Sequence, residues 1–61
     1  MRALTPEQQR VAKLALMTGF YQHQVAAYYD LNQGRTSEFR RSEQFHQVAP
    51  APELPNDFPA H

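Results

Sequence analysis

Cysteine is absent from this chain of 61 residues. Neither a disulfide nor a thiolate metal site can therefore support its core, so helix packing or a partner must do so. Long apolar runs are also absent. The longest mainly apolar stretch, residues 11–17, contains Lys13 and is far shorter than the roughly 20 residues that cross a bilayer. We therefore expect no membrane-spanning helix and no association with a membrane.

The first ten residues, MRALTPEQQR, lack the apolar segment of a secretory signal. We therefore expect a cytoplasmic protein. A chain of this length forms one small domain and buries only about 60% of its unfolded surface, which disfavours an elaborate active site.

Catalytic and metal-binding patterns are missing too. No nucleophile turn or oxyanion-hole glycine frames Ser37, Ser42 or His46, so we expect no enzyme. The three histidines His23, His46 and His61 share no ligand spacing. The sequence therefore predicts neither a metal nor a cofactor.

The net charge of zero hides an asymmetry. Residues 1–41 carry six basic and three acidic side chains, an excess of three positive charges, whereas residues 42–61 carry three acidic side chains and no basic one. A basic body with an acidic tail is compatible with nucleic-acid binding, but so modest an excess is also usual on an ordinary solvated surface.

A first helix is predicted over residues 6–18. Thr5 is a suitable N-cap, Pro6 suits the first helical position, and Gln8 completes a capping box. Gly19 supplies the left-handed conformation that commonly ends a helix. The residues predicted to face inward at helical spacing are Val11, Leu14, Ala15 and Thr18. Ala12, Leu16 and Met17 widen this apolar surface almost around the helix, and some of it either meets another subunit or is simply exposed.

A second helix is predicted over residues 21–29 and a third over residues 33–41, which residues 42–47 either extend or follow with a short fourth turn. Ala26 leaves room for the third helix to cross the second closely. Between them Asp30 tolerates a positive φ, Leu31 fills the core and Asn32 caps the third helix. The third helix is expected to point Thr36 and Phe39 inward, with Phe45 and Val48 facing back to the body.

The end of the chain has a different composition. Four of the five prolines lie between Pro50 and Pro59, which excludes a helix and predicts an extended or disordered tail, with disorder favoured. Leu54 and Phe58 are its only large apolar residues, and they either have no role or dock into a groove on this molecule or a neighbour. The sequence thus divides into a helical domain over residues 1–48 and a Pro-rich acidic tail over residues 49–61.

The segment VAAYYDLNQGRTSEF, residues 25–39, resembles the helix-turn-helix of small prokaryotic and phage DNA-binding regulators, including the resolvase-like and repressor-like domains of recombinases and transposases. Ala26 stands at that family's small residue, and Leu31 and Phe39 stand at its hydrophobic positions. Asp30 departs from its usual glycine, and Thr36 from its usual aliphatic residue. The resemblance implies an all-α, tri-helical domain.

The resemblance also implies a DNA interface, with the third helix in the major groove and residues near its N-terminus against base edges. The implied base contacts are Asn32, Gln33, Arg35, Ser37 and Glu38. The implied phosphate contacts are Tyr21, Gln22, Gln24, Gly34, Arg40 and Arg41. Amides suit adenine, arginine suits guanine, and glutamate accepts from cytosine or orients an arginine. The alternative is an ordinary solvated helix surface.

Two function classes remain open. The first is a sequence-specific transcriptional regulator of a prokaryote, phage or mobile element, which binds double-stranded DNA as a homodimer, associates with the nucleoid and acts most simply as a repressor. The second is a protein-interaction module, an anti-regulator or adaptor. Its partner would be contacted through Leu16, Met17, Leu54 and Phe58.

Overall fold

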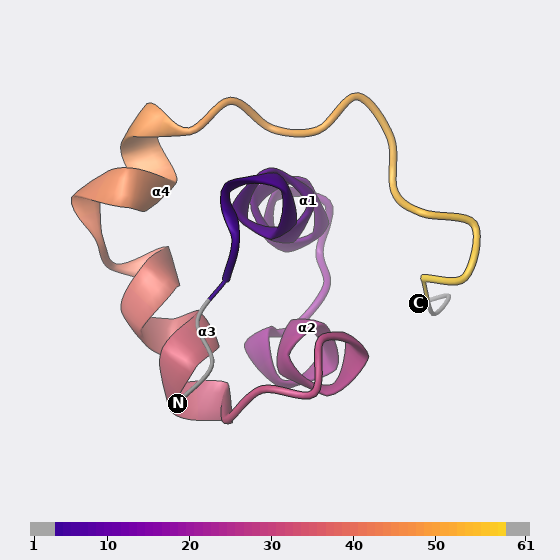
Figure 1. Ribbon diagram of the computed structural model, residues 1–61, viewed down its shortest axis with the longest axis horizontal. Coiled ribbons are helices and arrows are strands. Elements are labelled where there is room, and N and C mark those ends of the chain that lie inside the picture. Colours follow the sequence, from indigo (N-terminus) through magenta and orange to yellow (C-terminus); the bar gives the residue numbers. More distant parts are fainter. Residues whose placement is uncertain (1–3, 59–61) are drawn as a thin grey trace.

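The computed structural model describes residues 4–58, and within them the chain is helical, with no strand. Its helices are α1 (Pro6–Met17), α2 (Gln22–Tyr28), α3 (Gln33–Arg40) and α4 (Glu43–Gln47). Figure 1 shows α1 in the middle, with α2, α3 and α4 following one another around it and residues 49–58 passing over its remaining side. The molecule is compact, with a radius of gyration of 10.3 Å.

The capping box predicted for the first helix is present. The Gln8 backbone N–H donates to Thr5 Oγ1 over 3.2 Å, and the Thr5 N–H donates to Gln8 Oε1 over 2.9 Å. The helix ends at Met17, one residue before the predicted end, and Gly19 follows with a φ of 103°. Its start and its end are therefore both set by local sequence signals.

The buried face of α1 differs from the predicted stripe. Ala12 and Ala15 are fully buried, while Val11 and Leu14 are half-buried and Thr18 is exposed. Because apolar residues occur almost around this helix, their spacing does not define a single face. Packing selects the small side chains, which let neighbouring helices approach closely.

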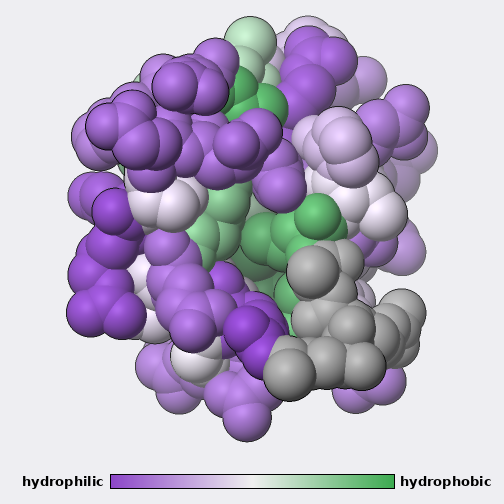
Figure 2. All heavy atoms as spheres, turned by 60° about the vertical axis from the view of Figure 1, so that its left-hand side comes forward, coloured by the Kyte–Doolittle hydropathy of each residue, from purple (hydrophilic) through white to green (hydrophobic). Residues whose placement is uncertain are grey.

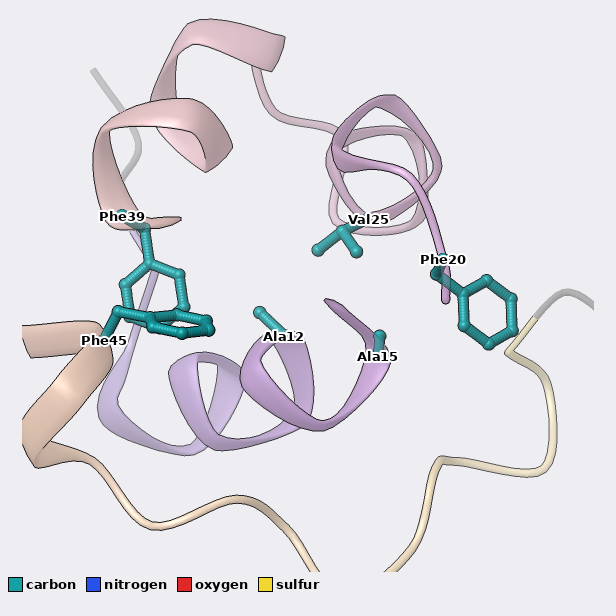
Figure 3. Close-up of a cluster of buried hydrophobic side chains, with 6 residues drawn as sticks. All are labelled: Ala12, Ala15, Phe20, Val25, Phe39 and Phe45. Carbon is teal, nitrogen blue, oxygen red and sulfur yellow. The ribbon is translucent and has the colours of Figure 1, made fainter. Parts of the chain in front are cut away.

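The core has two aromatic ends, which Figure 3 shows on either side of Val25 and the two alanines. At one end the rings of Phe39 and Phe45 meet edge to face, with centroids 5.4 Å apart. At the other end Phe20 faces the tail. The aromatic residues thus supply most of the buried volume in a core that is otherwise built from small side chains.

The corner between α2 and α3 is tight. Asp30 adopts a φ of 55°, and the Leu31 N–H donates to the Ala26 carbonyl over 2.8 Å. Ala26 is only 3% exposed, and α2 packs chiefly against α3. Leu31 is half-buried and lies outside the core cluster, so it does not fill the core as predicted. The turn points it to the edge of the domain.

Residues 43–47 form a separate helix and do not extend α3. The Ser42 hydroxyl donates to the Phe39 carbonyl over 2.8 Å and accepts from the Phe45 N–H over 3.3 Å. It therefore closes α3 and caps α4 with one side chain. The resulting bend brings Phe45 onto Phe39, and Val48 packs against the same core.

The described part of the tail, residues 49–58, contains neither helix nor strand and runs over α1. The Ala51 N–H donates to the Arg10 carbonyl over 3.0 Å, and Lys13 Nζ donates to the Val48 carbonyl over 2.9 Å. Leu54 and Phe58 pack against the core. Arg2, Pro59 and His61, which entered the sequence-based predictions, lie outside the described residues. Of the helices described, none has the length and apolar character needed to cross a bilayer.

Candidate nucleic-acid interface

Helix α3 has one buried side and one exposed side. Thr36 and Phe39 are buried, whereas Gln33, Gly34, Glu38, Arg40 and Arg41 are exposed. Figure 2 brings the α3 and α4 side of the molecule forward and shows it covered mainly by hydrophilic residues around a recess with an apolar floor. The polar residues singled out in α3 are thus accessible.

Arg35 and Glu38 form an ion pair on this side. Arg35 Nη1 donates to Glu38 Oε1 over 2.9 Å, one turn apart on the helix. The side chain of Arg35 is 33% exposed and that of Glu38 is 62% exposed. The carboxylate therefore holds the guanidinium against the helix, as expected of a glutamate that orients a neighbouring arginine.

The first turn of α3 is held by its N-cap. Asn32 Oδ1 accepts from the Gly34 N–H over 2.8 Å. A Cβ added at Gly34 would lie 3.2 Å from that oxygen, which is tighter than most contacts of this kind. Gly34, which the resemblance implies as a phosphate contact, thus makes room for the capping oxygen within its own chain.

The two arginines at the end of α3 are supported differently. The Arg40 guanidinium carbon lies 4.7 Å from the centre of the Phe45 ring, and Lys13 Nζ lies 5.2 Å from the same centre. Arg41 Nε donates to the Ser37 carbonyl over 3.4 Å. Both arginines remain exposed, so their guanidinium groups face solvent at the edge of the polar side.

Three further predicted contacts lie at the start of α2. Tyr21 is 68% exposed, and its backbone N–H donates to Gln24 Oε1 over 2.8 Å. Gln22 and Gln24 are half-buried. The Gln24 side-chain oxygen is thus used within the chain, while the Tyr21 ring projects from the surface.

Helices α2 and α3 share a groove of about 340 Å³. It is lined by Leu16, Phe20, Tyr21, Gln22, His23, Gln33 and Arg40. Four of these residues were predicted to contact DNA: two precede or begin α2, and two come from α3. The fold therefore brings together residues that lie up to 19 positions apart in the sequence.

His23 belongs to this groove and was missed by the sequence analysis. Its ring stacks on that of Tyr21, with centroids 5.5 Å apart and planes 9° from parallel. From the sequence, His23 was weighed only as a metal ligand, and its spacing excluded that role. Its position one residue after Gln22, at the start of the same helix, was the signal that pointed to the groove.

A second groove of about 350 Å³ lies on the other flank of α3. It is lined by Leu4, Gln9, Arg35, Glu38, Phe39, Ser42 and Gln44. The implied base contacts Gln33 and Arg35 therefore lie on opposite flanks of the helix. Ser37 is half-buried, and Asn32 uses its side-chain oxygen in the cap.

Within residues 4–58, the arginines of α3 and the carboxylates of the tail lie on different sides of the molecule. Arg35, Arg40 and Arg41 belong to α3 or its C-cap. The acidic residues Glu53 and Asp57 belong to the tail, which ends on the opposite side of the molecule in Figure 1. With Glu38 included, α3 and its C-cap carry three basic side chains and one acidic one, a net charge of +2 that an approaching polyanion meets.

No group of three His, Asp or Glu residues within positions 4–58 is placed to hold a metal ion. Tyr28 and Tyr29, whose pKa values are raised, lie in or at the end of α2 and do not line either groove. The chain matches no protein-family model, no curated protein and no solved structure.

Proposed function

We propose that this protein is a sequence-specific DNA-binding transcriptional regulator that places α3 in the major groove. In this proposal α1, α2 and α3 form a tri-helical helix-turn-helix domain. The observation that carries it is the groove between the start of α2 and α3, where Tyr21, Gln22, Gln33 and Arg40 converge. In the helix-turn-helix geometry, both helices of the motif approach the DNA together.

The corner between α2 and α3 supports the proposal. A left-handed residue at Asp30, a small buried residue at Ala26 and a side-chain cap at Asn32 are what a sharp turn between two closely crossing helices requires. Within residues 4–58, Gln33, Glu38 and Arg40 of α3 are exposed. A helix presented in this way has the diameter and the side chains to enter the major groove.

The contacts divide by chemistry. The side-chain amide of Gln33 can form two hydrogen bonds with the edge of one adenine. Arg40 and Arg41 at the far end of α3 are suited to phosphates, as is the Tyr21 hydroxyl. Arg35 can reach guanine in two ways. Either its guanidinium leaves Glu38 for the base, or Glu38 keeps its contact and orients the guanidinium toward the base. Because an exposed ion pair contributes at most about 1 kcal/mol, exchange for a guanine edge is feasible.

A homodimer follows from the size of α3. One eight-residue helix reads only a few base pairs, so two copies on symmetric half-sites are needed for a selective site. Among the described residues, the large apolar side chains that are exposed are those of Met17, at 60%, and Tyr21, at 68%, and they are available for contact with a second copy. A repressor that occludes a promoter is the simplest regulator of this kind.

The test is selection of duplexes from a random DNA pool at near-physiological salt, with the folded full chain. Enrichment of an inverted repeat is expected from a dimeric reader. On the selected duplex, with three or four phosphate-contacting cations per copy, the logarithm of the binding constant should fall with the logarithm of salt with a slope of about −3, and about twice that for a dimer.

Variants then locate the reading surface. Gln33→Ala is expected to weaken binding to the selected duplex by about 1–3 kcal/mol and to relax selectivity at one position. Gln47→Ala is the matched control, because Gln47 is also exposed and lies on α4. Arg35→Ala is expected to abolish selectivity while helicity is retained. If it leaves selectivity unchanged, Arg35 is not a base contact.

The absence of any enriched sequence would favour the protein-interaction alternative. Of the four residues predicted for a protein partner, Met17 is exposed, whereas Leu16, Leu54 and Phe58 pack against the core of the same molecule. Substitution of Met17 is therefore the sharper test of a partner on α1. A loss of DNA selectivity on Gln33→Ala but not on Met17→Ala supports the DNA-binding function.

A further inference from the structure

The last described residues occupy an aromatic site on the body. The Phe58 ring lies between Phe20, at a centroid distance of 4.9 Å and 87°, and Tyr28, at 4.6 Å and 48°. The Tyr28 hydroxyl donates to Asp57 Oδ1 over 2.6 Å. We call Phe20 and Tyr28 the aromatic pair. It recognises two features at once, a carboxylate and the aromatic ring that follows it.

Two basic side chains of α1 contact the start of the tail. Arg10 Nε donates to the Ala49 carbonyl over 3.3 Å, and Lys13 holds the Val48 carbonyl beside it. Residues 49–58 carry two acidic side chains and no basic one. The basic side chains of α1 thus hold the start of the tail through backbone carbonyl oxygens.

The tail is joined to the helices by contacts that can be released without unfolding them. None of the hydrogen bonds between the tail and the body belongs to the backbone ladder of a helix. Leu54 and Phe58 are only partly buried. Detachment therefore exposes the aromatic pair and leaves the four helices with their own caps.

The released segment is long enough to reach another molecule. Ten extended residues, 49–58, span about 33 Å, whereas the longest extent of the molecule is 25 Å. Val48 already has an extended backbone, with φ −75° and ψ 138°, and Pro50 and Pro52 favour extension beyond it. The direction of the tail can thus change at Val48 while α4 stays in place.

We infer that the aromatic pair binds the tail of a second copy of this chain, so that two copies exchange residues 49–58 reciprocally. Every copy carries both the site and the segment shown to fill it, which makes the contact self-complementary. A single tail from a second copy must compete with the molecule's own tail, whose effective concentration at the site is about 1 mM. A reciprocal exchange makes the second contact intramolecular and offsets that disadvantage.

This inference is independent of DNA binding. The tail ends on the opposite side of the molecule from α3, so exchange leaves the polar side of α3 uncovered (Figure 1). Its tests use no DNA. Failure of the selection experiment and failure of tail exchange are therefore separate results.

The first test is sedimentation equilibrium of the full chain over concentrations up to about 1 mM. Wild type is expected to dimerise within this range. A wild type that stays monomeric up to about 1 mM would overturn the proposal.

The second test pairs two complementary variants. Isotope-labelled Phe58→Ala keeps the aromatic pair and lacks its ring ligand, while Tyr28→Ala keeps an intact tail and loses half of its own site. Their mixture is expected to shift amide resonances around Phe20 and Tyr28 of the labelled chain, more than either variant does alone. No shift at about 1 mM of each would contradict exchange.

Circular dichroism of each variant controls for folding. Tyr28→Phe provides a milder substitution, since it keeps the ring against Phe58 and removes only the hydrogen bond to Asp57. As the unlabelled partner it is expected to cause smaller shifts than Tyr28→Ala, because its own site retains more affinity for its own tail. Equal shifts with the two partners would assign the association to another surface.

Discussion

The Tyr28 hydroxyl donates a 2.6 Å hydrogen bond to Asp57, 29 residues further along the chain, and so joins α2 to the end of the tail. This bond is the main reason why the pKa of Tyr28 is raised from 10.0 to about 12, with desolvation and the negative charge of Asp57 as smaller causes. Burial also raises the pKa of Tyr29. The hydrogen bond between α2 and the end of the tail thus depends on a neutral phenol.

The Tyr28–Asp57 hydrogen bond is therefore expected to be lost in alkaline solution. Because the pKa of Tyr28 is higher in the folded chain, its contribution to stability is complete below about pH 10 and is lost as the pH rises through about 12. Titration followed by tyrosinate absorbance should show a tyrosine that ionises near pH 12. Asp57→Asn should lower that pKa, and an unchanged titration would show that Asp57 does not set it.

The close crossing of α2 and α3 depends on Ala26. This residue is 3% exposed, so Ala26→Leu must push the two helices apart, at a cost of about 1–3 kcal/mol. Urea unfolding followed by circular dichroism measures the loss. Ala27→Leu is the control on the same helix, because Ala27 is exposed and the change there should stay within about 0.5 kcal/mol. Equal effects at both positions would argue against the close crossing.

Helix ends were the most predictable part of the fold. Thr5 with Gln8, Gly19 and Asn32 are local signals, and each acts over at most four residues. The rotation of α1 about its axis was not predictable in the same way. Val11, Leu14 and Leu16 make the helix apolar on most sides, and only contacts with distant segments select the Ala12 and Ala15 face.

The candidate site was predicted as a set of residue types, but not as an arrangement. Spacing placed Gln33 and Arg35 on the same exposed helix, yet the surrounding elements put them on opposite flanks of it. Likewise, the composition of the tail favoured disorder. The contacts of Phe58 with Phe20 and Tyr28 join residues at least 30 positions apart, and no local pattern encodes them.

Asp30 holds a left-handed conformation, with a φ of 55°, at a position where the resembling family usually has glycine. Asp30→Gly is therefore expected to be neutral within about 1 kcal/mol, since relief of the backbone cost offsets the greater freedom of the unfolded chain. Asp30→Val should destabilise by at least about 1–2 kcal/mol, because a β-branched residue rarely adopts this conformation. Thermal unfolding compares the variants. Asp30→Asn separates conformation from charge and should resemble wild type.

Thr36 is fully buried in α3, and among residues 4–58 its hydroxyl oxygen has no hydrogen-bond partner. A buried hydroxyl without a partner costs roughly 1–3 kcal/mol, and valine has nearly the same shape without it. Thr36→Val, which restores an aliphatic residue at this position, should therefore raise the free energy of unfolding by about 1 kcal/mol in urea titration. Thr36→Ser keeps the hydroxyl and removes a buried methyl group, so it should lower that free energy by about 1 kcal/mol. Threonine, valine and serine have similar helix propensities, so Thr36→Val reports on the buried hydroxyl and Thr36→Ser on the buried methyl group. A Thr36→Val variant that is less stable than wild type would mean that the hydroxyl has a partner, such as a buried water, and that the threonine contributes to the packing of α3.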